Sequence, residues 1–404
     1  MSLRHGVMVL ALAAALVTAG ALVTRDSASA GELTGTVPAN GGVALLNWSG
    51  GSTSEIVDDA GANGCRLSSI WSFPNGFPIG YLVGAPDFVN SAHLALYPGG
   101  NVPETPILAV CQRTELAPIV YRDRQFEVDE TRDIVYAKGL SHADWGSAKR
   151  SAIDLTLDVY EPQAVSSAPR PAIVIIHGGG FRSGDSQRQQ FIDAGRYYAS
   201  RGWVAFSINY RLAGQHGTVP SDWVSSKSAY AAIRDAKAAV RWVRAHADTY
   251  GLDPDRITAQ GGSAGAIAAL ALGTSDDADY RDELRLEDDW TLATTNPGRS
   301  ARVATVVDHW GSLSAVNALS WYDGQPRIDA SDAPTIIIHG TEDAIVPYAA
   351  GLAVRDAFLD AGIPVELQPI AGAGHSPWQA TIGGRSQHAI AVDFIVKHQG
   401  LDLR

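Results

Sequence analysis

The chain has 404 residues, 46% of them hydrophobic, and a formal net charge of −12 at pH 7. A chain of this length and apolar content can bury a sizeable core and form two or three domains, which excludes global disorder. Its negative charge repels phosphate groups, so we expect no nucleic acid partner and no binding to anionic membranes.

The first thirty residues have the features of a secretory signal peptide. Arg4 precedes an apolar run over residues 6–23, and the sequence ASA at 28–30 supplies the small residues that signal peptidase requires. We therefore predict cleavage after Ala30 and a secreted, extracellular protein. The apolar run is about long enough to span a membrane, so an uncleaved membrane anchor is the alternative.

Residues 31–115 are predicted to form a small accessory α+β module. GVALLNW at 42–48 and ETPILAVC at 104–111 have the composition of short strands, and SEIVDDAGAN at 54–63 that of a short helix. Its clustered aromatic residues could attach the protein to a cell wall or polymer, although a module this small needs most of them in its core. A linker is expected at 116–125.

The two cysteines of the chain, Cys65 and Cys111, both lie in this module. In an oxidising compartment we expect them to form a disulfide, which would contribute about 4 kcal/mol in the chain-entropy model. Two buried free thiols are the alternative. Neither cysteine has a partner ligand at the spacing of a zinc site, and we predict no metal and no organic cofactor.

From residue 126 onward, apolar strands alternate with helical segments. Residues 231–250 place apolar side chains at helical spacing and stop at Gly251. We predict that residues 126–404 form an α/β domain, a mostly parallel sheet with helices on both faces. Five runs are continuously apolar, as in strands buried on both sides of a sheet: 172–176, 204–208, 256–259, 302–307 and 334–338.

Two stretches interrupt this alternation. Residues 213–230 are long enough to cover an active site as a lid, although a peripheral loop is an equal alternative. The acidic residues at 275–290 are expected to form a solvated face or loop. A calcium site is a weak alternative there, because the carboxylates do not follow the twelve-residue calcium-loop pattern.

The sequence GGSAG at 261–265 surrounds Ser263 with very small residues, after a strand and before an alanine-rich helix. On a sharp turn between a strand and a helix, only small neighbours let the chain fold back on itself, and the serine Oγ is lifted clear of the sheet. The turn also directs the first helical amides at the atom that Oγ attacks. The N–H of Ala264 is therefore a candidate oxyanion donor.

The sequence HGGGF at 177–181 directly follows a predicted buried strand. Three consecutive glycines are costly in conformational entropy, which indicates that backbone amides must approach a ligand closely. We expect the amides of Gly179 and Gly180 to join that of Ala264 in an oxyanion hole. His177 is expected to be structural, with its imidazole hydrogen-bonded to the backbone of the loop.

A serine hydroxyl needs a histidine base, and the base needs a carboxylate that fixes its tautomer. Asp343 follows the predicted strand 334–338, and His375 lies in a glycine-rich loop after another strand-like segment. The order Ser263, Asp343, His375 is the one that a serine turn in this architecture requires. We predict these residues to be nucleophile, orienting acid and base.

These motifs resemble those of the α/β-hydrolase superfamily. The likeness covers residues 126–404 and is carried by HGGGF at 177, GGSAG at 261, HGTEDAIVP at 339 and GAGH at 372. Within the superfamily, the chain is similar to secreted bacterial carboxylesterases near the hormone-sensitive-lipase and feruloyl-esterase-like groups. The resemblance implies a serine esterase that cleaves short to medium acyl esters, either small or polymer-borne, through an acyl-enzyme. The helical cap of many relatives is replaced here by the accessory module, which leaves the ester unassigned.

Two other functions are compatible with the same motifs. A prolyl-oligopeptidase-like serine peptidase shares the order of the triad, but no propeller-like repeat precedes the predicted domain. A non-catalytic binding or adhesion protein could retain the hydrolase scaffold, because a fold alone does not prove an activity. Loss of a triad position would favour this second alternative, and no position is lost.

Overall fold

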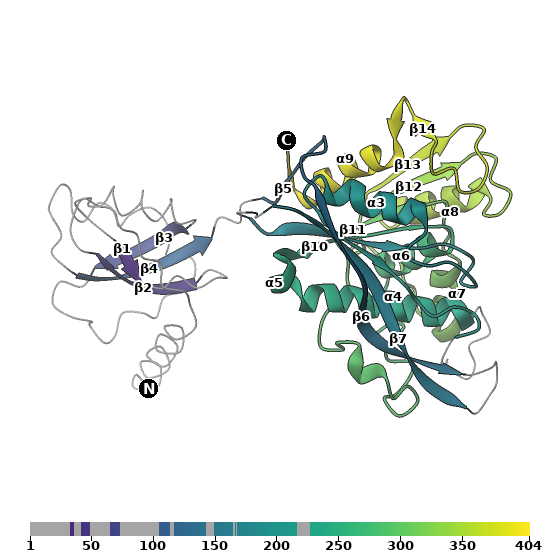
Figure 1. Cartoon of the computed structure of the whole chain (residues 1–404), viewed down its shortest axis with the longest axis horizontal. Helices are drawn as coiled ribbons and strands as arrows, with labels where there is room; N and C mark the ends of the chain where they lie inside the picture. Colours follow the sequence, from purple (N-terminus) through teal and green to yellow (C-terminus); the bar gives the residue numbers. More distant parts are fainter. Residues whose placement is uncertain are drawn as a thin grey trace. The chain divides into compact units, whose positions relative to one another are not determined.

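The computed structural model describes residues 33–35, 42–48, 65–72, 105–113, 117–142, 149–164, 166, 168–215 and 227–404. The chain divides into two compact units, Met1–Leu116 and Ala117–Arg404 (Figure 1). Within the described ranges, no helix combines the length and the hydropathy that crossing a membrane requires. The predicted signal peptide at 1–30 lies outside these ranges.

The first unit contains a four-stranded antiparallel sheet of order β1-β2-β4-β3. Its strands are β1 (Leu33–Gly35), β2 (Gly42–Trp48), β3 (Cys65–Ser72) and β4 (Thr105–Arg113). Strands β2 and β4 correspond to the two strands predicted from sequence. Strand β3 was missed, because its register shifts between Leu67 and Ser69 and this irregularity breaks the alternation of apolar residues. The predicted helix at 54–63 lies outside the described residues.

The backbone register brings the positions of the two cysteines close together. Cys65 is paired with Arg113, and Leu67 is paired with Cys111. Cys65 and Cys111 therefore occupy diagonal positions on adjacent antiparallel strands, where side chains of one face are neighbours. The side chains of this unit lie outside what the structure describes, so the disulfide stays a prediction.

The second unit is built on an eight-stranded sheet of order β13-β12-β11-β10-β8-β9-β7-β6. Neighbours from β13 to β9 are parallel, whereas β7 is antiparallel to both β9 and β6. The predicted mostly parallel sheet is therefore confirmed. The strands are β6 (Val128–His142), β7 (Arg150–Pro162), β8 (Arg170–Ile176), β9 (Val204–Ile208), β10 (Leu252–Gly262), β11 (Thr305–His309), β12 (Thr335–Gly340) and β13 (Val365–Ile370).

The second unit begins earlier than residue 126. Strand β5 (Ile119–Val120) pairs with β16 (Asp402–Leu403) near the other end of the chain. The expected linker at 116–125 is thus part of the second unit from Ala117 onward. A two-residue strand carries no periodicity, and its partner is distant in sequence, so this pairing leaves no signal in the sequence. A small hairpin of β14 (Thr381–Ile382) and β15 (Arg385–Ser386) follows β13.

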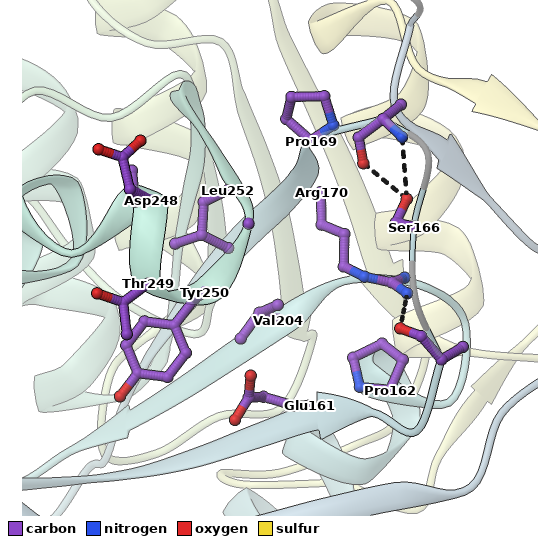
Figure 2. A pocket seen from close by; sticks show the side chains of 14 residues that line it. Glu161, Pro162, Ser166, Pro169, Arg170, Val204, Asp248, Thr249, Tyr250 and Leu252 are labelled. Atoms are coloured by element: carbon purple, nitrogen blue, oxygen red, sulfur yellow. Dashed lines mark hydrogen bonds between the residues drawn. The ribbon is translucent and has the colours of Figure 1, made fainter. Parts of the chain in front are cut away.

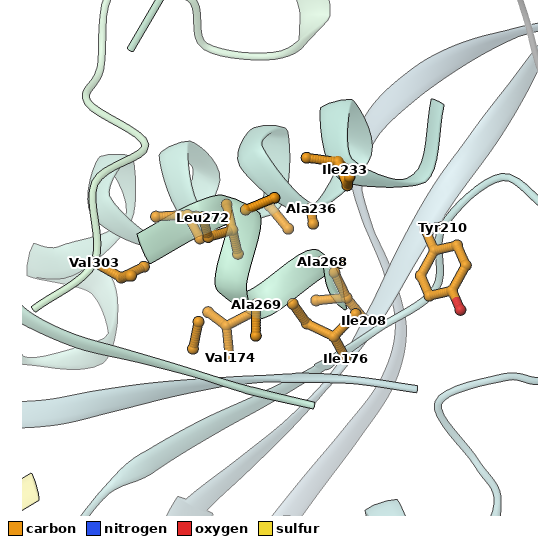
Figure 3. Packing of buried hydrophobic residues seen from close by; sticks show 14 of the residues in the cluster. Val174, Ile176, Ile208, Tyr210, Ile233, Ala236, Ala268, Ala269, Leu272 and Val303 are labelled. Carbon is orange, nitrogen blue, oxygen red and sulfur yellow. The ribbon is translucent and has the colours of Figure 1, made fainter. Parts of the chain in front are cut away.

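Helices cover both faces of the sheet (Figure 1). Alternate residues of β8 show the two layers, because Ile173 and Ile175 pack with α3 and α9, whereas Val174 and Ile176 pack with α4 and α6. Figure 3 shows α6 between the sheet and α4. The helices are α3 (Gln189–Ala199), α4 (Lys227–Ala245), α5 (Ala247–Tyr250), α6 (Ala264–Thr274), α7 (Ser314–Asp323), α8 (Tyr348–Asp360) and α9 (Gln387–Gln399), with a 3-10 turn, η3 (Leu292–Thr294).

The helix predicted over 231–250 is divided in two. Helix α4 begins four residues earlier, at Lys227, and ends at Ala245, and the short α5 follows it. Gly251 ends α5 in the left-handed conformation, with φ of 59°, as the sequence predicted. Most of the predicted lid at 213–230 lies outside the described residues, so that role stays a prediction.

The acidic stretch at 275–290 forms turns and loop in which most acidic residues are at least partly exposed, as its composition predicts, but one of them, Asp289, is buried. Asp289 forms a buried ion pair with Arg234 of α4, at 3.1 Å. One turn further along α4, Lys237 donates to the hydroxyl of Ser275 and to the carbonyl of Asp276. The stretch is therefore held against α4 by buried cations, a relation between distant segments that charge composition alone does not reveal.

Candidate active site

Ser263 lies between β10 and α6 in a backbone conformation that is rare for a residue with a side chain. Its φ is 56° and its ψ is −120°. The amide of Ser263 donates to the carbonyl of His309 on the neighbouring strand, at 2.9 Å, which holds the turn against the sheet. Strained backbone of this kind persists only where the surroundings fix it, and it is characteristic of a nucleophile turn.

Close backbone approaches explain why glycines surround Ser263. A Cβ on Gly261 would lie 2.2 Å from the carbonyl oxygen of Gly265, and one on Gly262 would lie 2.5 Å from the indole of Trp378. A Cβ on Gly265 would lie 2.1 Å from the carbonyl oxygen of Ile176. A larger residue at Gly261 or Gly265 would push α6 away from β10 and β8. The sequence GGSAG thus lets the helix begin directly above the strand ends.

The structure brings the three predicted side chains together. His375 Nε2 lies 3.0 Å from Ser263 Oγ, although the two residues are 112 positions apart in the sequence. His375 Nδ1 lies 2.7 Å from Asp343 Oδ2. An ionised carboxylate only accepts hydrogen bonds, so Nδ1 carries the hydrogen and Nε2 is left to accept from the serine hydroxyl.

Asp343 is buried and fully engaged in hydrogen bonds. Its Oδ1 accepts from the amides of Ile345 and Val346, at 2.8 and 2.9 Å. Burial by itself would raise the pKa of Asp343, but the hydrogen bonds from His375 and from these two amides outweigh it and hold the pKa below its ordinary value. The carboxylate is therefore ionised at neutral pH. The adjacent Glu342 is exposed and does not take part in this arrangement.

The loops that carry Asp343 and His375 are held to each other through their backbones. The amide of Glu342 donates to the carbonyl of Ala373, at 2.9 Å. A Cβ on Gly340 would lie 2.4 Å from the same carbonyl oxygen. Because β12 and β13 are adjacent parallel strands, both loops leave the same end of the sheet. The separation between the acid and the imidazole is thus fixed by main chain.

A buried polar network anchors the segment that follows His375. Gln387, the first residue of α9, donates from Nε2 to the carbonyls of Pro377 and Ala380, at 2.6 and 3.2 Å. Its Oε1 accepts from His309 Nδ1, at 3.1 Å. Burial lowers the pKa of His309 to about 3, so this ring is neutral. The sequence analysis did not identify His309 or Gln387 as parts of the site. In the sequence, they are marked only by being polar residues within otherwise apolar segments.

The predicted oxyanion donors lie at the adjacent strand ends. Gly179 and Gly180 follow β8 with φ values of 116° and 63°, which explains why glycines are needed there. A Cβ on Gly180 would meet no atom within 4 Å, so the space beside this residue is open. Among the described residues, the amides of Gly179, Gly180 and Ala264 have no hydrogen-bond acceptor, which leaves all three available to a ligand.

His177 has the structural surroundings that the sequence analysis expected. Its Nδ1 lies 2.7 Å from the carbonyl oxygen of Gly178, and its ring stacks on that of Tyr210 at 4.1 Å between centroids. The hydroxyl of Tyr210 donates to the carbonyl of His177, at 2.8 Å. Burial lowers the pKa of His177 to about 4, so the ring is neutral and acts as packing for the glycine loop.

A cavity of about 480 Å³ lies at the other end of the sheet (Figure 2). It is lined by the first residues of β8, β9 and β10, among them Arg170, Val204 and Leu252, whereas Ser263 follows the last residue of β10. The guanidinium of Arg170 donates to the carbonyls of Gly202 and Ala164, so it holds loops together. In the described part of the chain, no group of three or more His, Cys, Asp or Glu side chains is arranged to hold a metal ion.

The chain is similar to several proteins described as esterases. The BD-FAE family model matches residues 157–323, a range that contains Ser263 and ends before Asp343. Esterase LipC of Mycobacterium tuberculosis is 26% identical over 256 residues, which cover 58% of this chain and 60% of that protein. The probable carboxylic ester hydrolase LipM of the same organism is 27% identical over 262 residues, covering 59% of this chain and 54% of that protein. The chain thus spans less than two thirds of the length of these curated relatives. A solved structure of Thermogutta terrifontis esterase 2, phosphorylated by paraoxon, is 29% identical, covers 67% of this chain and 94% of that chain, and has a TM-score of 0.48.

Proposed function

We propose that the chain belongs to the α/β-hydrolase superfamily, in its hormone-sensitive-lipase-like carboxylesterase group, and that it hydrolyses carboxylic esters. One observation carries the proposal, the continuous hydrogen-bonded series from Ser263 Oγ through His375 to Asp343 Oδ2. A hydroxyl, an imidazole and an ionised carboxylate in this order are the groups that turn a serine into a nucleophile.

In the proposed first half-reaction, Ser263 Oγ attacks the ester carbonyl carbon while His375 Nε2 takes the hydroxyl proton. The tetrahedral intermediate collapses, the bond to the alcohol oxygen breaks, and His375 gives the proton to the departing alcohol. The acyl group then remains on Ser263. Asp343 keeps its negative charge throughout and stabilises the imidazolium that forms between the two proton transfers.

In the second half-reaction, a water molecule replaces the alcohol. His375 Nε2 takes a proton from the water, whose oxygen attacks the acyl carbonyl carbon. The bond from the acyl group to Oγ breaks, Oγ recovers the proton, and the carboxylic acid leaves. The amides of Gly179, Gly180 and Ala264 are the proposed donors to the negatively charged oxygen in both intermediates. Removing one such donor typically costs about 10²–10³ in rate.

The proposed substrates are esters of short to medium acyl chains, either as small molecules or as groups on a polymer. A cover over the site, if residues 213–230 form one, would exclude long acyl chains. We further propose that the protein is exported after cleavage at Ala30. The diagonal register of Cys65 and Cys111 supports the proposed disulfide in the first unit. Separately, we propose that residues 31–115 attach the enzyme to a cell wall or polymer.

The proposal is tested with p-nitrophenyl esters of rising acyl length, a peptide p-nitroanilide and methyl ferulate, assayed with the wild type, Ser263→Ala and Ser314→Ala. Ser314 is exposed at the start of α7 and serves as the matched control. We expect the wild type and Ser314→Ala to cleave the short esters and Ser263→Ala to lose about 10⁴ or more in rate. Cleavage of the peptide alone would indicate a peptidase, and a folded wild type that cleaves nothing would indicate a binding protein.

A further inference from the structure

A second imidazole, that of His339, lies close to the carboxylate of Asp343. His339 is the penultimate residue of β12 and lies four positions before Asp343, and both side chains have 0% of their surface exposed. His339 Nε2 lies 2.8 Å from the carbonyl oxygen of Val346 and 3.5 Å from Asp343 Oδ2. The oxygen that His339 faces is the one that accepts from His375.

The tautomer of His339 follows from its neighbours. A carbonyl oxygen only accepts hydrogen bonds, so Nε2 carries the hydrogen. Burial is the largest effect on the pKa of His339 and lowers it, against the opposing influence of Val346 and Asp343, and the ring is therefore neutral. On its other side, Nδ1 has no hydrogen-bond partner among the residues that the structure describes, and it faces Gly351, where a Cβ would lie 2.8 Å from it. The edge of the ring of Tyr348 completes the packing.

Both backbone polar groups of Val346 are hydrogen-bonded in this arrangement. Its amide donates to Asp343 Oδ1, and its carbonyl accepts from His339 Nε2. The two groups belong to successive peptide units, so together the two hydrogen bonds fix the backbone on both sides of the Val346 α-carbon. The orientation of the carboxylate is thus coupled to His339, although the two side chains are not directly hydrogen-bonded. Nδ1 of His339 is buried and has no partner within the described ranges, which costs free energy. The hydrogen bond from Nε2 to Val346 is a reason for a histidine at this position despite that cost.

We propose that His339 is a positioning residue, which fixes the 343–346 turn so that Asp343 presents Oδ2 to Nδ1 of His375. The inference rests on the proposed esterase function, because it assigns His339 a role in that reaction. His339 touches neither Ser263 nor the expected position of the ester. Its loss should therefore slow the chemical step and leave substrate binding unchanged.

The test compares His339→Leu and His339→Gln in the full chain with the wild type. A glutamine amide can occupy the place of Nε2 and still donate to Val346, whereas leucine cannot. We expect His339→Leu to lower kcat by about 10- to 100-fold, the range for a small misplacement of a catalytic group, with KM within about twofold. His339→Gln should retain most of the wild-type kcat. His246→Leu is the matched control, since His246 also bonds a backbone carbonyl, at 2.8 Å from that of Trp242.

Two readouts separate positioning from a loss of folded protein. Rates are expressed per Ser263 labelled by a fluorophosphonate, so unfolded enzyme does not count. The acidic limb of kcat/KM, which reports the ionisation of the base, should move to lower pH in His339→Leu, because a misdirected carboxylate stabilises the imidazolium less. A purely structural role would leave this limb and the rate per labelled serine unchanged, and that result would overturn the inference.

The low-field proton resonance of the His375–Asp343 hydrogen bond gives a readout that needs no ester. It should be present in the wild type and in His339→Gln and be lost or shifted in His339→Leu. An unaltered resonance in His339→Leu contradicts the inference, whereas failure of the wild type to cleave any ester contradicts the proposed function. If His339→Leu does not fold, His339→Asn replaces it, because the asparagine amide takes the place of Nδ1, faces Gly351 and does not reach Val346.

Discussion

The α-carbon of Gly265 packs against the carbonyl oxygen of Ile176, so closely that a Cβ would lie 2.1 Å from that oxygen. Ile176 is the last residue of β8, and the glycine loop that contains Gly179 and Gly180 follows it. Gly265 is in the first turn of α6, next to Ser263 and Ala264. This contact therefore fixes the distance between the serine and two of its proposed oxyanion donors.

We predict that Gly265→Ala destabilises the protein and removes most of its esterase activity. Helix propensity alone would favour alanine by roughly 0.5–1 kcal/mol, but overpacking against a backbone carbonyl typically costs about 1–3 kcal/mol or more, so the clash dominates. Thermal unfolding and kcat/KM measure the two effects. Gly298→Ala is the control, because a Cβ there would meet no atom within 4 Å and its φ is not positive. If Gly265→Ala and Gly298→Ala have the same unfolding temperature and the same kcat/KM, the contact between Gly265 and Ile176 contributes to neither stability nor activity.

We predict that removing the charge of Asp343 lowers kcat strongly, whereas removing the charge of Glu342 hardly changes kcat. Asp343→Asn places an amide opposite Nδ1 and favours the wrong tautomer of His375, at a cost of about 10⁴ in kcat. Glu342→Gln should change kcat by no more than about twofold, since this side chain is exposed and only its backbone amide is bonded, to Ala373. The measurement is kcat on a short p-nitrophenyl ester. A larger loss in Glu342→Gln would reverse the assignment of the acid.

Asp308 is predicted to make stability fall with rising pH. It is fully buried, its Oδ1 accepts from the amide of Gly311 at 2.6 Å, and its Oδ2 has no partner among the described residues. Burial is the largest effect and raises the pKa of Asp308 from 3.8 to about 7, although the Gly311 amide lowers it. Between these values the folded state keeps a proton that the unfolded chain has lost. The free energy of unfolding therefore decreases from about pH 4 to pH 7 and then levels off.

Asp308→Asn should remove this pH dependence, because the amide is neutral at every pH. Relative to the wild type, we expect the variant to gain a few kcal/mol of stability between pH 4 and pH 8. Urea unfolding at both pH values measures the difference. Identical slopes of stability against pH in the two proteins would mean that Asp308 is ionised in the folded state.

A chain that begins at Ala117 is predicted to keep its activity. The unit boundary lies between Leu116 and Ala117, and the proposed catalytic residues all belong to the second unit. Turnover of a small soluble ester should stay within a few-fold of the full chain, since the second unit has its own core. A start at residue 126 should be less stable, because it deletes β5 and its pairing with β16. A folded but inactive 117–404 chain would mean that the first unit shapes the active site.

The parallel core of the sheet could be predicted because its strands are buried on both faces. The apolar runs of β8, β9, β11 and β12 are buried along their whole length. Strand β6 was not predicted, because its pairing with β7 shifts register twice and Asp133 has a φ of 57°, so no period of two survives. The pairing of β5 with β16 is too short to have a pattern at all.

The candidate site shows the same division between local and distant signals. Ser263, Asp343 and His375 follow strands within short motifs, and the motifs restrict the choice to these residues. The roles of His339 and Gln387 depend instead on carbonyl groups of Val346, Pro377 and Ala380. Every residue type has a backbone carbonyl, so hydrogen bonds to carbonyl groups cannot be predicted from the amino-acid types of the partners. Buried polar side chains at strand and helix ends become informative only when the backbone positions are known.

Strand β13 lies at the edge of the eight-stranded sheet, and it is also the last strand of this sheet to be synthesised. During translation, the strands that flank Ser263 and the helix after it are made long before residue 375 exists, since 112 positions separate the serine from its base. His375 follows β13, which pairs with β12 at the edge of the sheet. Adding β13 therefore does not require any other pair of strands to separate. An incomplete chain that ends before β13 consequently holds Ser263 without its proposed base, so the proposed ester cleavage requires the last strand of the large sheet.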